Sequence, residues 1–194
     1  MKTPYPLILA STSKYRGSLL AQLGWEFEAV APGVDEDKIK EKNLHPAELA
    51  RELSLLKAQA VFARRNESCV IGSDQVCHLE GLILGKPHTK ERAYEQISQM
   101  QGKTHELLTA VTVMSPRESI TFLNTTTLHM RKLTLREIKE YVDFDLPLDC
   151  AGSYKLESRG IKLFHKIETT DQTAIIGLPL IELTDVLLKQ GFPF

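Results

Sequence analysis

The chain has 194 residues, of which 42% are hydrophobic and 25% are charged, and its formal net charge is −1. This length and composition are typical of a globular protein with a sizeable core, built as one large domain or as two small lobes around a cleft. The near-zero net charge argues against a general nucleic-acid binder.

The first structured stretch combines a strand pattern, a hydroxyl-rich turn and a helix pattern. The apolar run 7–10 predicts a buried strand, Ser11 and Ser13 follow it, and leucines at helical spacing then predict a helix that ends near Gly24. Unpaired N–H groups at the start of such a helix favour an anion, and Ser11 and Ser13 can add hydroxyl donors. A cation in the first turn is unfavourable to the helix dipole, so a bound phosphate would explain Arg16. The alternative is an ordinary N-cap at Ser13 and a solvated Arg16.

A second short strand is expected over residues 27–30, followed by a turn and then by the adjacent carboxylates of Asp35 and Glu36. Two carboxylates just beyond a strand could bind a metal ion, although such a pair is more often part of a solvated loop. We expect residues 38–43 to form a charged loop.

A long helix is expected to begin at Pro46, because proline is favoured in the first turn. Its apolar stripe is predicted to be formed by Leu49, Leu53, Leu56 and Ala60. Lys57 borders this stripe, so periodicity favours a side chain that extends to solvent from the helix edge over one that enters a cleft.

The next apolar strand is predicted over residues 69–72, and Asp74 follows at its expected end. A carboxylate in so apolar a run is unusual, because burying an unpaired charge is costly. Reactive groups in α/β folds commonly lie at strand ends, which makes Asp74 the strongest single candidate for function. The alternative is a structural Asp that accepts hydrogen bonds from turn amides.

The remaining elements follow from turn and cap signals. We expect a hairpin turn at residues 80–81, a helix capped by Thr89, strands over 105–113 and 120–130, a helix opened by the capping box 134–137, a strand over 161–164, a polar loop over 169–173 and a final helix over 181–189. Together these predict an α/β fold with a broad, partly antiparallel sheet and flanking helices.

Several classes of protein are disfavoured by what the sequence lacks. The cysteines Cys69, Cys77 and Cys150 have no zinc-type spacing, and their odd number in apolar segments predicts reduced, buried thiols in a cytosolic protein. Signatures of zinc proteases, P-loop proteins, Rossmann domains and α/β-hydrolases are absent from the sequence. We expect neither a signal peptide nor a membrane span.

Taken together, the motifs resemble those of the Maf family of nucleotide pyrophosphatases over nearly the whole chain. The segments that carry the resemblance are Ser11-x-Ser13-x-x-Arg16, Val34-Asp35-Glu36, Lys57-Ala58, Gly72-Ser73-Asp74-Gln75, Gly85-Lys86-Pro87, Ala151-Gly152-Ser153-Tyr154 and Gly177-Leu178-Pro179-Leu180. Each segment is weak alone, but their order and spacing are specific.

The resemblance implies a single Maf/ITPase-like domain over residues 1–194, with a mixed α/β sheet and two lobes around a deep cleft. It implies cleavage of a nucleoside triphosphate between the α and β phosphates, with a divalent cation, Mg²⁺ or Mn²⁺. The implied roles are a proton acceptor at Asp74, a metal site at Glu36 and Asp74, and phosphate binding by Ser11, Ser13, Arg16, Lys57 and Lys86. The expected partner is a small-molecule nucleotide in the cytoplasm, without nucleic acid or membrane; the oligomeric state, monomer or homodimer, stays open.

Three positions depart from the pattern of the thymidine/uridine branch of the family, which usually has Arg, Thr and Gln where this chain has Tyr15, Gln75 and Glu157. The segment that ends at Glu157 resembles the branch that acts on 7-methyl-GTP. The chemistry agrees, because a 7-methylguanine ring is cationic and can stack on Tyr15, while a carboxylate at Glu157 can accept the guanine N–H donors.

The substrate expected from this resemblance is 7-methyl-GTP, hydrolysed to 7-methyl-GMP and pyrophosphate so that a modified nucleotide stays out of nucleic acids. The alternatives are a dTTP/UTP pyrophosphatase of the same family and a nucleotide-binding regulator of cell-division arrest. A pure binder would not need the base at Asp74, so release of pyrophosphate separates the enzyme from the regulator.

Overall fold

The computed structural model describes residues 3–194, and the chain divides into two compact units. The first unit contains the chain up to Asp74 together with Thr109–Asn124 and Asp171–Phe194, and the second contains Gln75–Leu108 and Thr125–Thr170. Hydrogen bonds join the strands in the order β2-β1-β3-β5-β6-β7, and β4 pairs with β3. The strands are β1 (Leu7–Leu9), β2 (Phe27–Ala29), β3 (Cys69–Leu79), β4 (Leu82–Ile83), β5 (Thr104–Met114), β6 (Ser119–Met130) and β7 (Phe164–Glu168).

The sheet is mixed, which confirms the predicted α/β class. Strand β1 runs parallel to β2 and β3, whereas β4 pairs antiparallel with β3 and β7 antiparallel with β6. The helices are α1 (Lys14–Ala21), α2 (Glu36–Lys40), α3 (Pro46–Phe62), α4 (Lys90–Met100), α5 (Leu135–Asp145) and α6 (Leu180–Lys189), with short 3-10 helices η1 (Ala151–Ser153), η2 (Arg159–Leu163) and η3 (Gln172–Ile176). None of these helices of residues 3–194 is long and apolar enough to cross a membrane.

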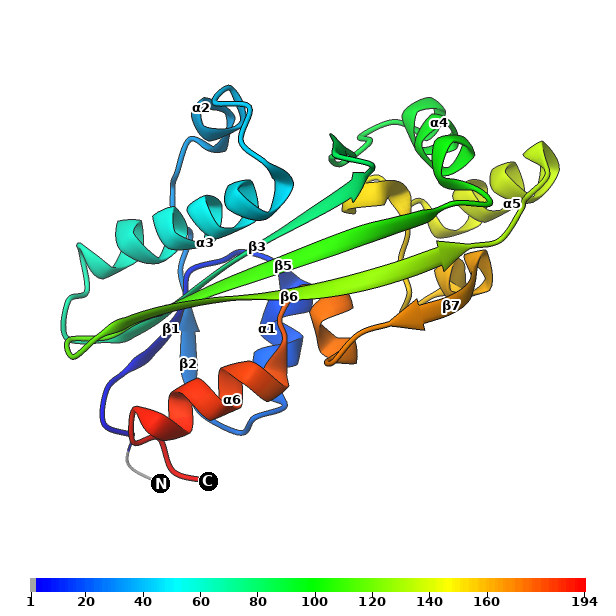
Figure 1. Ribbon diagram of the computed structural model, residues 1–194. Coiled ribbons are helices and arrows are strands. Elements are labelled where there is room, and N and C mark those ends of the chain that lie inside the picture. The colour runs from blue at the N-terminus through cyan, green and yellow to red at the C-terminus, as the bar shows by residue number, and fades with distance from the viewer. Residues whose placement is uncertain (1–2) are drawn as a thin grey trace. The chain divides into compact units, whose positions relative to one another are not determined.

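In the first unit, side-chain alternation sorts the strand residues onto two helical layers. Leu7 and Leu9 pack in a cluster with residues of α1 and α6, whereas Ile8 and Val70 pack against α3. Figure 1 shows α3 on one face of these strands and α1 and α6 on the other. The same alternation places Gly72 and Asp74 on the α3 face of β3.

Gly72 permits an unusually close approach of β3 to α3. A Cβ atom at this position would lie 2.3 Å from the carbonyl oxygen of Ser54 and 2.7 Å from the backbone nitrogen of Ala58. Real Cβ atoms essentially never come so close, so a side chain at Gly72 would push the strand from the helix. The missing side chain therefore brings Asp74, two residues further on the same face, within reach of α3.

The second unit has its own apolar core. Ile97 and Met100 of α4 and Ile138 of α5 are each no more than 2% exposed. Tyr154 packs edge-on against Phe164 with ring centroids 5.0 Å apart. The hairpin turn before β4 has positive φ at Glu80 and Gly81, as the sequence predicts.

Two predicted elements are wrong at this level. The charged loop expected over residues 38–43 is partly helical, because α2 spans Glu36–Lys40 and is supported by ion pairs of Lys40 with Glu36 and Asp37. The strand expected over residues 161–164 is largely the 3-10 helix η2, and β7 begins only at Phe164. A short apolar run fits both conformations, and pairing with β6 decides between them.

Candidate active site

The turn after β1 is tied together by its own hydroxyl groups. Ser13 is the N-cap of α1, and its hydroxyl oxygen accepts the backbone N–H of Arg16 at 3.4 Å. The backbone N–H of Ser13 in turn donates to Oγ of Ser11 at 3.1 Å. Ser11 is only 6% exposed, so its hydroxyl lies inside the protein just beyond the end of β1. Both readings of Ser13, as an N-cap and as part of a phosphate site, are compatible with this geometry.

Arg16 is not the solvated surface residue of the alternative reading. Its Nε atom donates to the carbonyl oxygen of Gly177 at 3.0 Å, and Nη1 lies 3.5 Å from Oγ of Ser11. Ser73 also donates to the carbonyl oxygen of Gly177, at 2.9 Å. The motif Gly177-Leu178-Pro179-Leu180 points to this segment, but no sequence signal points to its carbonyl oxygen.

The electrostatic surroundings of Arg16 connect it to two carboxylates. Desolvation lowers the pKa of the Arg16 guanidinium below its ordinary value, while the negative charges of Asp74 and Glu36 oppose this decrease. An arginine remains protonated at neutral pH under such a shift. Arg16 is therefore a fixed cation within electrostatic range of both candidate metal ligands.

Lys57 joins Glu36 and Asp74 into one cluster, which we call the carboxylate–lysine cluster. Its Nζ atom lies 2.6 Å from Oδ1 of Asp74 and 2.7 Å from Oε1 of Glu36. The side chains of Lys57 and Asp74 are 8% and 11% exposed, and that of Glu36 is 39% exposed. Charges buried this deeply are stable only with paired partners, and Lys57 supplies the pairing.

The expectation that Lys57 extends to solvent is wrong. Ala50, Ser54, Lys57 and Val61 are all buried and recur at helical spacing, whereas Leu56 and Ala60 are only half-buried. The buried face of α3 is therefore rotated from the predicted apolar stripe and includes two polar residues. Periodicity read from apolar residues alone could not include them, because their partners lie on other elements.

The position of Asp74 also differs from the prediction. Asp74 does not end a strand, because β3 continues from Cys69 to Leu79. Its neighbour β1 is much shorter and ends at Leu9, which pairs with Ile71. Asp74 therefore lies beyond the carboxyl end of β1, on the side where Ser11 follows, and so keeps the environment for which it was singled out.

The remaining predicted residues have simpler surroundings. Tyr15 lies in the first turn of α1 in the first unit and is 36% exposed. Lys86 and Glu157 belong to the second unit and are exposed, Lys86 in the segment after β4 and Glu157 in the turn before η2. Gln75 follows Asp74 in β3 and is half-buried. The structure thus brings together Ser11, Ser13, Arg16, Glu36, Lys57 and Asp74 in the first unit.

The donor types in the carboxylate–lysine cluster suit a hard cation. Carboxylate oxygens are the protein ligands of Mg²⁺, which typically takes one or two of them and completes its shell with water and phosphate. Residues 3–194 contain no group of three or more His, Cys, Asp and Glu side chains arranged for a metal ion. Two carboxylates that share one ammonium group fit a substrate-assisted magnesium site and not a zinc site. Asp35 pairs with Lys38 at 3.2 Å, and its side chain is 55% exposed.

The expectation of reduced, buried thiols is confirmed for Cys69 and Cys77, whereas Cys150 is partly exposed. Cys69, Cys77 and Cys150 are free, and the first two are buried. Burial raises the pKa of each of these thiols to about 12. They are therefore protonated at neutral pH and unsuited to act as nucleophiles.

Comparison with known proteins decides the family. The family model described as Maf-like protein matches residues 6–190. The chain belongs to the Maf family. Several relatives of this chain carry the name 7-methyl-GTP pyrophosphatase. The Bdellovibrio bacteriovorus protein is 52% identical to this Maf chain over 181 residues, which cover 93% of this chain and 95% of the relative.

Two further relatives have similar coverage. The Xanthomonas axonopodis pv. citri protein is 46% identical over 186 residues, covering 96% of this chain and 97% of the relative. The Pseudomonas aeruginosa protein is 44% identical over 187 residues, covering 95% and 96%. The resemblance to the Maf family, and to its 7-methyl-GTP branch, is therefore confirmed for this Maf chain.

Proposed function

We propose that this Maf protein hydrolyses 7-methyl-GTP to 7-methyl-GMP and pyrophosphate, and so keeps a modified nucleotide out of nucleic acids. The observation that carries the proposal is the buried Asp74, held by Lys57 beside the hydroxyl-rich turn that follows β1. A hydrolase needs a positioned base near a phosphate-binding surface, and in this proposal Asp74 is that base and the turn is part of that surface. The names of the relatives support the same activity and the same substrate.

In this proposal Asp74 accepts the proton of the water molecule that adds across the α–β phosphoanhydride bond. Lys57 binds Oδ1 of Asp74 and so orients the carboxylate, whose Oδ2 is the acceptor that remains for water. Phosphate contacts come from Ser11, Ser13, Arg16, Lys57 and Lys86. Their role is to offset the negative charge that moves to the leaving pyrophosphate.

Glu36 and Asp74 are the proposed ligands of a divalent cation, Mg²⁺ or Mn²⁺. When bound, such an ion would neutralise phosphate charge and polarise the water molecule or the anhydride. The protein residues keep their roles of binding and orientation around it.

Activity is expected to require the divalent cation, because the proposed ligands at Glu36 and Asp74 are carboxylate oxygens, the donors that hard cations prefer. Exhaustive treatment with a chelator should abolish pyrophosphate release, and Mg²⁺ or Mn²⁺ should restore it. The measurement is pyrophosphate released from 7-methyl-GTP before and after chelation. Full activity after metal removal would contradict the proposed roles of Glu36 and Asp74 as ligands.

Recognition of the base is proposed for Tyr15, Gln75 and Glu157. The ring of Tyr15 is accessible, as a stacking surface must be, and Glu157 is exposed. A cationic 7-methylguanine gains cation–π attraction to Tyr15 and Coulombic attraction to Glu157 that unmodified guanine lacks. The phosphate-binding residues cannot discriminate among nucleotides that carry the same triphosphate.

We expect kcat/KM to be higher for 7-methyl-GTP than for GTP, dTTP and UTP. A cation–π contact alone contributes about 0.5–2 kcal/mol, a factor of about 2 to 30. A nucleotide panel measured on the wild type and on Tyr15→Arg, Gln75→Thr and Glu157→Gln tests each residue separately. A wild type that prefers dTTP or UTP would refute the branch assignment, and an unchanged ratio in Glu157→Gln would remove that residue from base recognition.

The wider setting of the enzyme is also part of the proposal. We propose one Maf-like domain over residues 1–194, because the family match at residues 6–190 extends across both compact units. The free cysteines suit the cytoplasm, and the partner is a small nucleotide and neither nucleic acid nor membrane. Light scattering of the purified protein would distinguish a monomer from a homodimer.

A further inference from the structure

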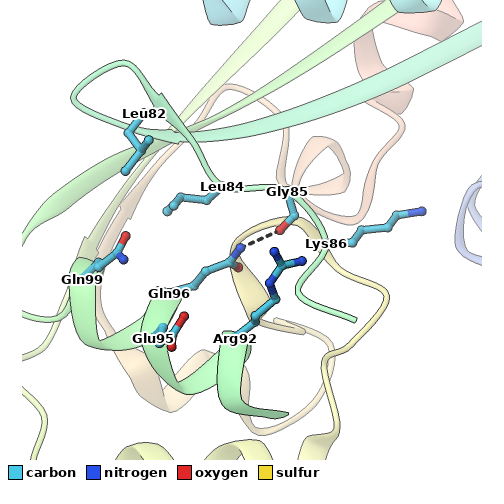
Figure 2. Close-up of a pocket in the computed structure, with 8 residues that line it drawn as sticks. All are labelled: Leu82, Leu84, Gly85, Lys86, Arg92, Glu95, Gln96 and Gln99. Carbon is cyan, nitrogen blue, oxygen red and sulfur yellow. Dashed lines mark hydrogen bonds between the residues drawn. The ribbon is translucent and has the colours of Figure 1, made fainter. Parts of the chain in front are cut away.

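A hollow of about 380 Å³ in the second unit is lined by the segment that carries Lys86 and by one face of α4. Arg92, Gln96 and Gln99 contribute from α4, and Leu84, Gly85 and Lys86 contribute from the segment after β4. Figure 2 shows Gln96 extending from α4 to Gly85, while the Lys86 side chain extends away from the hollow. The residues that line this hollow therefore include the ones that hold the backbone next to Lys86, a proposed phosphate-binding residue.

Gln96 uses both ends of its side-chain amide. Its Nε2 atom donates to the carbonyl oxygen of Gly85 at 3.0 Å, and its Oε1 atom accepts the hydroxyl of Ser153. Ser153 is fully buried and has a positive φ of 62°, which is unfavourable for a residue other than glycine. One glutamine thus joins the segment before Lys86 to the Ala151–Ser153 turn.

Backbone hydrogen bonds complete this connection on both sides of Lys86. Gly152 donates its N–H to the carbonyl oxygen of Leu84 at 3.1 Å, and His88 donates to that of Leu148 at 3.1 Å. Pro87 is buried and has a restricted φ. Lys86 is therefore an exposed side chain on an anchored backbone, and the Gln96 bond is the side-chain anchor nearest to it.

We propose that Gln96 is a positioning residue that holds the Gly85–His88 backbone so that Lys86 reaches the triphosphate. The role given to Lys86 rests on the proposed function. The anchoring of the Gly85–His88 backbone by Gln96 does not depend on it. Gln96 does not touch substrate in this proposal. Gln99, one turn further along α4, lines the same hollow and is exposed, and its side chain forms no hydrogen bond described for residues 3–194, which makes it the matched control.

Gln96→Glu removes the donor to Gly85 and retains an acceptor for Ser153, whereas Gln96→Met, of similar length, removes both interactions. Gln99→Glu adds the same charge to the same helix without removing either bond. Amide hydrogen exchange should rise in peptides covering residues 84–88 for both Gln96 variants, and it should stay at the wild-type level for Gln99→Glu. Equal exchange in the Gln96 and Gln99 variants would overturn the proposal, whether or not the protein hydrolyses nucleotides.

Kinetics then test the link to Lys86. Loss of one neutral hydrogen bond should lower kcat/KM about fivefold, and by the same factor for 7-methyl-GTP, GTP and dTTP, because Lys86 binds the part that they share. In a Lys86→Met background, Gln96→Glu should have no further effect. If Gln96→Glu lowered kcat/KM equally in the presence and absence of Lys86, the positioning role of Gln96 would be overturned. A wild-type protein that is inactive on every triphosphate would refute the proposed function. The hydrogen-exchange result would then still decide whether Gln96 anchors the Gly85–His88 backbone.

Discussion

Turnover of 7-methyl-GTP by Asp74→Asn is expected to fall at least about a hundredfold while the protein remains folded and binds nucleotide. The substitution removes a proton acceptor and a metal-binding oxygen but keeps a side chain of the same shape. Asn can still contact Lys57 through its carbonyl oxygen, and Glu36 still pairs with Lys57, so no buried ammonium group is left without a partner.

Single-turnover kinetics and nucleotide binding by calorimetry would separate the lost chemistry from lost binding. Asp37→Asn is a matched control, because Asp37 lies in α2, is 84% exposed and pairs only with Lys40 among the ion pairs described for residues 3–194. This control should keep wild-type rates. Wild-type turnover by a folded Asp74→Asn protein would exclude Asp74 from the mechanism.

Lys57→Met is expected to be the most destabilising of the substitutions considered, and it should lower activity at least about a hundredfold. Removing the ammonium group leaves two carboxylates that converge on the same place, one of them 11% exposed. Breaking a buried ion pair costs about 3–5 kcal/mol of stability. Because Glu36 is partly hydrated, we expect the free energy of unfolding of Lys57→Met to be about 3 kcal/mol lower than that of the wild type. Urea denaturation measures the loss in stability.

Lys40→Met is the corresponding surface control. Lys40 also pairs with Glu36, at 3.9 Å, but its side chain is 51% exposed, so its removal should cost less than about 1 kcal/mol. Mg²⁺ or Mn²⁺ should raise the melting temperature of Lys57→Met more than that of the wild type, since the two carboxylates are left to share a cation. Equal stabilities of the two variants would contradict the importance of burial at Lys57.

Local signals in the sequence were sufficient for most helices and strands. Ser13, Thr89 and Thr134 each cap a helix with their side chains, as their positions before apolar periodic runs predict. Cap and turn conformations depend on a few neighbouring residues, so they can be read without knowledge of the fold. The motifs also identified the family and nominated the site residues, because residue type and order along the chain are enough for that.

Tertiary structure decided how those residues meet. The burial of Lys57 depends on Asp74, 17 residues away in the chain, and on Glu36. Neither partner belongs to α3, so the periodicity of that helix could not predict the pairing. Gln96 acquires a role only because Gly85 and Ser153 lie within reach of it. Each of these features is a side-chain contact between different elements of the fold, and its free energy exists only once the chain has folded. The sequence alone thus determined the capped elements, the family and the identity of the candidate groups, while only the fold decided that a buried lysine neutralises the proposed base.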